Sequence, residues 1–142
     1  MEFSFQHEWQ VNAPADRVAE VLLDLEHYPE WWPQVLAVAK IDDDTARVLC
    51  RSRLPYTLDL VLSARERGTT HLQVDLDGDL VGWSTFDLTP TAGGTQVGYR
   101  QEVSLTSPWL ARVARLAEPV LRWNHTQMMA GCREGLARRA QA

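Results

Sequence analysis

Alternating apolar and polar residues open the chain. In residues 2–11, every second side chain is apolar or aromatic, and the side chains between them are polar or charged. This period of two is typical of a strand with one buried face. The face that we expect to be buried carries Phe3, Phe5, His7, Trp9 and Val11.

Six further segments have the composition of strands and are separated by turn residues such as Asp42-Asp43-Asp44, Gly68, Gly78-Asp79 and Gly93-Gly94. Short connections of this kind are typical of antiparallel neighbours. The sequence therefore predicts one long antiparallel sheet of about seven strands. The six segments are residues 35–41, 46–53, 56–66, 71–77, 80–89 and 95–105.

A helical period replaces the alternation at residues 14–26. One face is apolar, and Pro14 fits the first turn of a helix, with Asn12 or Ala13 as its cap. We expect this helix to end before Pro29, because a proline restricts the residue that precedes it, and Pro33 to close the next turn. The apolar face carries Val18, Val21, Leu22 and Leu25.

A second helical segment begins at Ser107-Pro108, a plausible N-cap and first-turn pair. Pro119 should break or kink it, leaving a short first helix and a main helix of about 20 residues, roughly 30 Å long. One face of the main helix should grip the sheet. That face carries Leu121, His125, Met128, Cys132 and Leu136, and the whole chain, residues 1–142, is predicted to be a single α+β domain.

Adjacent tryptophans follow the first helix, at Trp31 and Trp32. Two such side chains so close together are not expected to point into one small core. At least one should line a groove or the mouth of a cavity, which favours a binding protein.

These motifs resemble the start of the START-like (SRPBCC) superfamily, and the chain is similar to a bacterial branch of it. The segment from Asn12-Ala13-Pro14 through Asp24 to Tyr28-Pro29-Glu30-Trp31-Trp32-Pro33 carries the resemblance. Leu54-Pro55-Tyr56, Gly78-Asp79-Leu80, Gly94-Thr95 and Trp123-Asn124-His125 continue it over essentially the whole chain. The superfamily includes polyketide cyclase/dehydrases, pollen-allergen-like proteins, coenzyme-Q-binding proteins and ribosome-associated proteins. The resemblance implies a helix-grip fold, in which a curved antiparallel sheet wraps a long C-terminal helix around an apolar cavity.

The composition of the chain limits which classes of partner we expect. The net charge of −5 argues against nucleic acid, because phosphate binding needs a positive surface. No apolar run is long enough to span a membrane, and the N-terminus lacks the features of a signal peptide, so a cytoplasmic location is expected. Thirteen of the fourteen basic residues are arginine, which we interpret as a bacterial coding bias. Cys50 and Cys132 form no paired motif and are expected to be buried, reduced thiols.

Familiar catalytic and cofactor motifs are missing. The four histidines have no metal-ligand spacing, and no nucleophile elbow or phosphate-binding loop is present, so neither a metal nor a cofactor is expected. Asp75, Asp77 and Asp79 alternate as in calcium loops, but the further acidic ligand is absent.

Three polar residues are weak catalytic candidates: Arg53, Tyr99 and His125. His125 lies on the apolar face of the main helix, either as a core histidine with one hydrogen bond or as a polar anchor or acid/base at the cavity wall. On the last strand, Tyr99 and Gln101 should face inward, leaving Arg100 in solvent. An arginine in the pocket could bind a carboxylate or polarise a carbonyl, although a solvated arginine is the more common case.

A larger set should line the cavity, because six tryptophans in one small domain are difficult to pack without a void. We expect three or four of the aromatic candidates, which also include Trp123, to touch ligand. The predicted ligand-binding residues are Trp31, Trp32, Tyr56, Trp83, Phe86, Tyr99, Gln101, Asn124, His125 and Met128.

Three functions remain open. The first is carriage or sensing of a hydrophobic or aromatic small molecule in an internal cavity. The second is a polyketide aromatase/cyclase, because Tyr99-x-Gln101 and Thr126-Gln127-Met128 resemble those enzymes, although a tryptophan-arginine pair in the middle strands is missing. The third is a protein-interaction module with an exposed patch at Trp31-Trp32 or a basic face for RNA. A protein partner is left open, as is the choice between monomer and homodimer.

Overall fold

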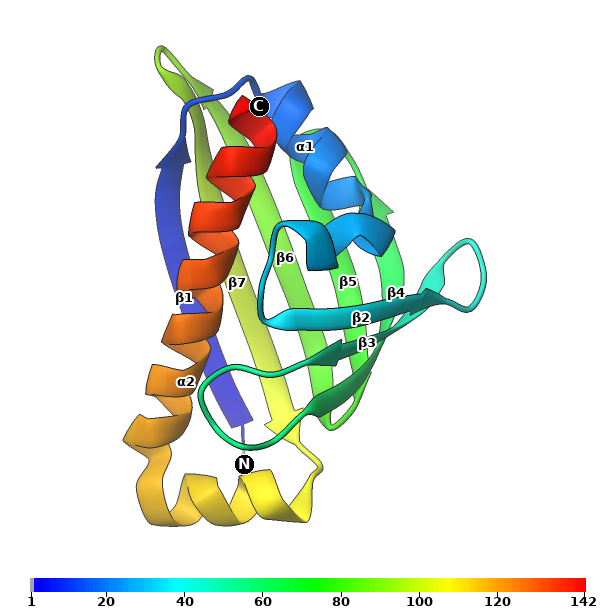
Figure 1. Cartoon of the computed structure of the whole chain (residues 1–142), viewed down its shortest axis with the longest axis vertical. Helices are drawn as coiled ribbons and strands as arrows, with labels where there is room; N and C mark the ends of the chain where they lie inside the picture. Colours follow the sequence, from blue (N-terminus) through cyan, green and yellow to red (C-terminus); the bar gives the residue numbers. More distant parts are fainter. Residues whose placement is uncertain (1) are drawn as a thin grey trace.

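The computed structural model describes residues 2–142 as a curved sheet packed against one long helix (Figure 1). The seven strands lie in the order β1-β7-β6-β5-β4-β3-β2, and every neighbouring pair is antiparallel. The strands are β1 (Glu2–Val11), β2 (Val35–Lys40), β3 (Thr45–Cys50), β4 (Leu58–Arg67), β5 (His71–Gly78), β6 (Leu80–Thr91) and β7 (Gly94–Leu105). This is the helix-grip fold that the sequence predicts.

The first strand, β1, pairs with the last strand, β7, although the two are far apart in the chain. Phe3 lies opposite Val103, and His7 lies opposite Tyr99. Along β7, Val97, Tyr99, Gln101 and Val103 are buried and Arg100 is exposed, as predicted. Because successive side chains of a strand point to opposite faces, this register places both Tyr99 and Gln101 on the concave face.

Two short helices follow β1: α1 (Ala15–Leu23) and the 3₁₀ helix η1 (Leu25–Glu30). The predicted single helix over residues 14–26 is therefore interrupted at Asp24, and Pro29 lies inside η1 instead of beyond a helix end. Pro14, in an extended conformation, is the N-cap of α1, and no side chain caps that helix. The prediction of Asn12 or Ala13 as cap was wrong.

The long helix α2 (Pro108–Gln141) bends at Ala117, whose φ of −153° and ψ of 63° are not helical. The bend precedes Pro119 because a proline disfavours helical conformation in the residues before it and removes a helix hydrogen bond. Ser107 caps the helix, since its hydroxyl accepts a hydrogen bond from the Leu110 N–H. Both features were predicted.

Burial separates the inner face of α2 from its outer face. Leu121, Cys132 and Leu136 are buried against the sheet, and both cysteines are free and buried, as predicted. The third strand ends at Cys50 instead of Arg53, so residues 51–57 form a connection that lies beside α2 (Figure 1). No helix among residues 2–142 is long and apolar enough to cross a membrane.

Candidate functional site

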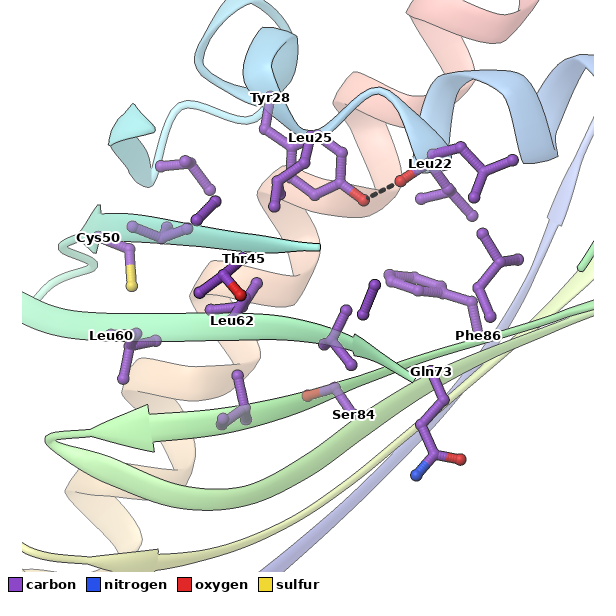
Figure 2. A pocket seen from close by; sticks show the side chains of 18 of the residues that line it. Leu22, Leu25, Tyr28, Thr45, Cys50, Leu60, Leu62, Gln73, Ser84 and Phe86 are labelled. Carbon is purple, nitrogen blue, oxygen red and sulfur yellow. Dashed lines mark hydrogen bonds between the residues drawn. The ribbon is translucent and has the colours of Figure 1, made fainter. Parts of the chain in front are cut away.

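A cavity of about 300 Å³ lies between the concave face of the sheet, the α1–η1 segment and α2. Its walls are mainly aliphatic. Figure 2 shows Leu22, Leu25 and Tyr28 facing the cavity from the α1–η1 side, with Leu60, Leu62 and Phe86 on the opposing strands. Other apolar side chains of the wall are Val35, Val48, Leu72, Val74, Leu76, Leu80 and Met128.

Two buried aromatic side chains fix the α1–η1 segment over the cavity. The Tyr28 hydroxyl donates a hydrogen bond of 2.6 Å to the Leu22 carbonyl (Figure 2), which holds η1 against the end of α1. The Trp32 indole N–H donates to the Met128 carbonyl of α2 at 2.9 Å. Burial raises the pKa of the Tyr28 phenol well above its ordinary value, so this hydroxyl stays protonated and keeps donating.

Polar side chains gather on one part of the cavity wall. Ser84 of β6, Tyr99 and Gln101 of β7 and His125 of α2 all line it. The Ser84 and Tyr99 hydroxyls are 3.2 Å apart, Tyr99 donates to Gln101 Oε1, and His125 Nε2 lies 3.2 Å from the same oxygen. The four groups therefore form one continuous hydrogen-bonded chain from the sheet to the helix.

The direction of each hydrogen bond follows from Gln101 Oε1, which can only accept. His125 must donate through Nε2–H, and Ser84 must donate to Tyr99, because the Tyr99 proton is used toward Gln101. Burial, together with the nearby His7 and Arg122, lowers the pKa of His125 to about 3. The imidazole is therefore neutral at pH 7, with its lone pair on Nδ1.

That Nδ1 atom is closed off from solvent and has no hydrogen-bond partner among residues 2–142. The His125 ring stacks on Phe5, with 3.7 Å between ring centroids, and lies 5.7 Å from the His7 ring. An unpaired lone pair in this setting is less costly than an unpaired buried N–H, which supports the Nε2–H tautomer.

Two groups of the chain retain unused hydrogen-bonding capacity. Gln101 is only 6% exposed, yet no described residue accepts a hydrogen bond from its amide nitrogen. Ser84 donates its one proton to Tyr99, so its oxygen can still accept. The wall thus offers a molecule in the cavity one amide donor and one hydroxyl acceptor.

A second hollow, of about 70 Å³, lies between β1, the residues 51–57 connection and the first part of α2. Five side chains line both hollows and form the partition between them: Leu58, Leu80, Gln101, His125 and Met128. Asn124 fixes the connection: its Oδ1 accepts hydrogen bonds from the Arg53 and Leu54 N–H groups at 2.7 and 2.8 Å.

Charged side chains surround the other end of the cavity, where the β2–β3 hairpin meets η1 and β4. Arg67 pairs with Asp44 at 2.8 Å, and Lys40 lies 3.5 Å from Asp43 and 3.9 Å from Glu26. All of these groups are exposed, so each pair contributes little to stability. Their excess of carboxylates, which also includes Asp24, Asp42 and Glu66, makes this mouth acidic.

Most of the predicted site residues line one of the two hollows. The larger cavity has Trp32, Phe86, Tyr99, Gln101, His125 and Met128 in its wall, and the smaller one adds Tyr56 and Asn124. Whether any of them binds ligand stays a prediction.

The remaining candidates lie elsewhere. Trp31 is buried in the core against Tyr28 and Trp32, so the expectation that the adjacent tryptophans would not both point into one core was wrong. The expectation that at least one of them lines a cavity is confirmed by Trp32. Trp83 lies on the outer face of the sheet beneath Arg100, and Trp123 is half exposed on α2. The Arg53 side chain is exposed, and it lines neither hollow.

Sequence reasoning missed Ser84, Tyr28 and the aliphatic wall. Ser84 could have been found from the period of two, because it lies two positions before Phe86 on the same strand. In the sequence, Tyr28 is noticeable only as part of the motif that carries the family resemblance. Among residues 2–142, no cluster of three or more His, Cys, Asp and Glu side chains is suited to a metal ion.

Comparisons with known proteins agree with this geometry. A sequence profile of the family described as polyketide cyclase/dehydrase and lipid transport matches residues 2–140. No curated protein sequence matches the chain significantly.

Solved structures share the fold at low identity. The Zhui aromatase/cyclase from Streptomyces sp. R1128 has a TM-score of 0.83 and 13% identity, with 99% of this chain and 94% of that chain covered. A protein of Thermus thermophilus has a TM-score of 0.81 and 16% identity, covering 99% and 97%. A START superfamily protein from Mycobacterium smegmatis has a TM-score of 0.74 and 17% identity, again covering 99% and 97%.

Proposed function

Because the chain belongs to the polyketide cyclase/dehydrase and lipid transport family, we propose that it carries or senses a compact hydrophobic or aromatic molecule in the cavity between sheet and α2. The observation that supports this most directly is an aliphatic cavity with four polar side chains gathered on one wall. Apolar pockets with a few placed polar groups are typical of small-molecule sites, because burial supplies affinity and the polar groups orient the ligand.

Cavity size restricts the ligand. A dry cavity of about 150 Å³ accommodates one benzene ring, so about 300 Å³ suits roughly two rings or a short branched chain. A long, extended acyl chain would need both hollows, and the partition that includes Gln101, His125 and Met128 lies between them.

The polar wall favours a ligand that carries a carbonyl or another hydrogen-bond acceptor. The free Gln101 amide N–H groups would donate to it, and the Ser84 oxygen could accept from a hydroxyl beside it. A ligand acceptor at this point would pair with the amide within a largely apolar wall, where a hydrogen bond is stronger than the same bond in water. We therefore expect the ligand to be a cyclic ketone, a quinone or a phenolic ketone, and not a pure hydrocarbon.

The alternative is a polyketide aromatase/cyclase, and the meeting of Tyr99, Gln101 and His125 on one wall favours keeping it. Such chemistry needs a group that takes a proton from the substrate. His125 is neutral, but its Nε2–H is a donor to Gln101 and its Nδ1 is closed off. Burial raises the pKa of Tyr99, so its hydroxyl stays protonated and no phenolate is available to take a proton. Carriage therefore has more support than catalysis.

A pair of ligands that differ only in a carbonyl tests the proposal. We expect 1-tetralone to bind more tightly than tetralin when each is titrated into the protein by calorimetry, because only the ketone can accept from Gln101. Native mass spectrometry of freshly purified protein, compared with denaturing conditions, would reveal a resident ligand of the same class. Failure of both ketone and hydrocarbon to bind, with no resident ligand, would contradict the proposal.

The mass of a ligand extracted after incubation with the protein distinguishes carriage from catalysis. A carrier returns its ligand with unchanged mass after incubation, whereas a cyclase acting on a poly-β-ketone thioester lowers the mass of the extracted product by the water lost. Mass spectrometry of the extract, with His125→Gln as the control variant, distinguishes the two.

A further inference from the structure

Several large apolar side chains are exposed on the two helical segments that meet at the α2 bend. We call this stretch the bend surface; it carries Trp109, Leu116, Val120 and Trp123, with Arg112 and Arg115 between them in the sequence. Leu116 is 81% exposed and Trp123 is 50% exposed. Half of the eight exposed large apolar side chains in residues 2–142 fall in this short stretch. Clustered exposure of this kind indicates an interaction surface, whereas scattered single residues do not.

The segment is amphipathic and firmly held from below. Leu110, Ala114 and Leu121 are buried in the core cluster beneath the bend, and Ser107 caps the start of the helix. The bend at Ala117 turns the chain sharply, and the two segments of α2 meet at an outer corner of the molecule (Figure 1). A protruding apolar corner fits a surface that can be penetrated better than it fits a rigid concave partner.

Unpaired positive charge lies on and beside the bend, although the chain as a whole carries −5 and Asp79 contacts Thr106 just before the helix. Arg112 and Arg115 are exposed, as are Arg51 and Arg53 on the connection that Asn124 fixes beside α2. None of these four arginines forms an ion pair with any residue of 2–142. The only carboxylate within the bend itself, Glu118, already pairs with Arg122.

We propose that the bend surface docks the protein on an anionic lipid bilayer. Trp109 and Trp123 have the amphipathic rings that suit the lipid headgroup region, Leu116 would enter the acyl boundary, and the unpaired arginines would meet lipid phosphates. The acidic mouth of the larger cavity is at the β2–β3 hairpin, which lies away from the α2 bend (Figure 1), and it would be repelled by the same lipids. The charge distribution therefore orients the molecule on the bilayer.

Docking in this orientation would bring the second hollow toward the lipid. That hollow is lined by Leu54 and Tyr56 of the connection and by Leu110 and Leu121 of α2, and Tyr56 stacks on Trp109 at 5.0 Å. The partition of Leu58, Leu80, Gln101, His125 and Met128 separates it from the larger cavity. The docking proposal does not depend on what the larger cavity binds.

Vesicle cosedimentation tests the proposal. The probes are vesicles of phosphatidylcholine alone and vesicles with about 30% phosphatidylglycerol, which supply the negative surface potential. We expect the protein to sediment with the anionic vesicles only, and added salt to release it, because surface charges are screened. Leu116→Asp and the double variant Arg112→Gln/Arg115→Gln should each weaken partitioning roughly tenfold or more.

Matched controls separate docking from general charge and folding effects. Leu36→Asp makes the same exchange at a leucine that is 52% exposed on β2, and Arg133→Gln/Arg138→Gln removes the same charge from exposed positions on the far part of α2. Both should sediment like the unmodified protein. Circular dichroism melts of every variant identify any that fails to fold.

Three outcomes would overturn the proposal. The unmodified protein could stay in the supernatant with anionic vesicles, or all variants could sediment equally. In a third outcome, the protein does not bind vesicles, but in size-exclusion chromatography it elutes as an oligomer that the Leu116→Asp variant converts to a monomer. The bend surface would then be a protein interface.

Discussion

Gln101 of β7 and His125 of α2 meet across the cavity wall, with 3.2 Å between Gln101 Oε1 and His125 Nε2. This hydrogen bond connects the sheet to the long helix at the partition between the two hollows. The same two side chains therefore hold the fold together and shape the proposed ligand site, so variants at either position must be tested for both stability and binding.

Replacing Gln101 by methionine should remove the ketone preference. Gln101→Met keeps the length of the side chain but removes the amide donor, so 1-tetralone should bind no better than tetralin. The change also leaves the Tyr99 hydroxyl and His125 Nε2–H without their acceptor, which should cost about 1–3 kcal/mol of stability. Calorimetry measures the first effect and urea unfolding the second.

A glutamine on the opposite face of the same strand provides the control. Gln96 is partly exposed, lines neither hollow and precedes Tyr99 and Gln101 on β7. Gln96→Met should leave both the ketone preference and the unfolding free energy nearly unchanged. An undiminished preference for the ketone in Gln101→Met would show that the amide is not the ligand's donor.

Stability should fall as pH is lowered below the ordinary pKa of histidine. The pKa of His125 is lowered from 6.5 to about 3 by burial, so between these values the unfolded chain binds a proton that the folded protein does not. The stability that comes from keeping His125 neutral is fully present above pH 6.5 and is lost progressively as the pH falls toward 3. The slope is at most about 1.4 kcal/mol per pH unit. Urea unfolding between about pH 5 and 7 covers the upper part of this window.

His125→Gln should flatten that slope. His7, whose pKa burial also lowers, contributes with the same sign and should account for part of the residual. His27 and His71 have raised pKa values from hydrogen bonds to Asp24 and Asp87, so their stabilisation is present at low pH and is lost as pH rises. Both are largely exposed and should matter little. Equal slopes for His125→Gln and the unmodified protein would contradict the buried, neutral histidine.

Gly135→Ala should destabilise the protein even though alanine favours helices. In an exposed helix the exchange would gain roughly 1 kcal/mol. Here a Cβ at position 135 would collide with the carbonyl of Trp31, because α2 and the end of η1 pack backbone to backbone at this point. We expect a loss of about 1–3 kcal/mol, measured by thermal or urea unfolding.

Gly98→Ala is the comparison, because a Cβ there would make ordinary contacts of 3.7 Å or more with Asp87. Its stability should change much less than that of Gly135→Ala. A stabilised Gly135→Ala would mean that α2 and η1 lie further apart than described.

Two tryptophans distinguish the cavity from the outer face of the sheet. Trp32 lines the cavity and donates to Met128, whereas Trp83 lies beneath Arg100. Ligand binding should change the Trp32 fluorescence, so Trp32→Phe should lose most of the ligand-induced signal and weaken binding. Trp83→Phe should retain both signal and affinity, and a reversal of this order would place the ligand elsewhere.

The sequence predicted most elements correctly where a single period dominates. Residues 2–11 and 95–105 alternate without interruption, and both strands form with the expected faces buried. The first α-helix ends before Pro29, as predicted, but it ends already at Leu23. The continuous helix over residues 14–26 was wrong, because a separate 3₁₀ helix that contains Pro29 follows Asp24. Arg53 was assigned to a strand because alternation continued past Cys50, whereas Asn124, some seventy positions away, fixes that segment as a connection.

Several residues of the site could be predicted from the sequence, but the hydrogen bonds and contacts between them could not. Tyr99, Gln101 and His125 could be placed on inward faces by strand and helix periodicity, because that depends only on local geometry. Trp31 and Trp32 could not be separated, since their neighbours come from α2 and from each other. The position of Trp83 on the outer face follows from its alternation with Ser84, a signal that its aromatic character obscured.

By itself, the sequence determined most of the elements, the buried faces of the regularly alternating strands and the family, because these depend on local periodicity and on short motifs. The tertiary structure alone decided the cavity, the shared acceptor of Tyr99 and His125, and the exposed corner at Leu116. These features require distances between residues far apart in the chain. Such distances are set by how the sheet curves and where α2 bends, and no local pattern contains them.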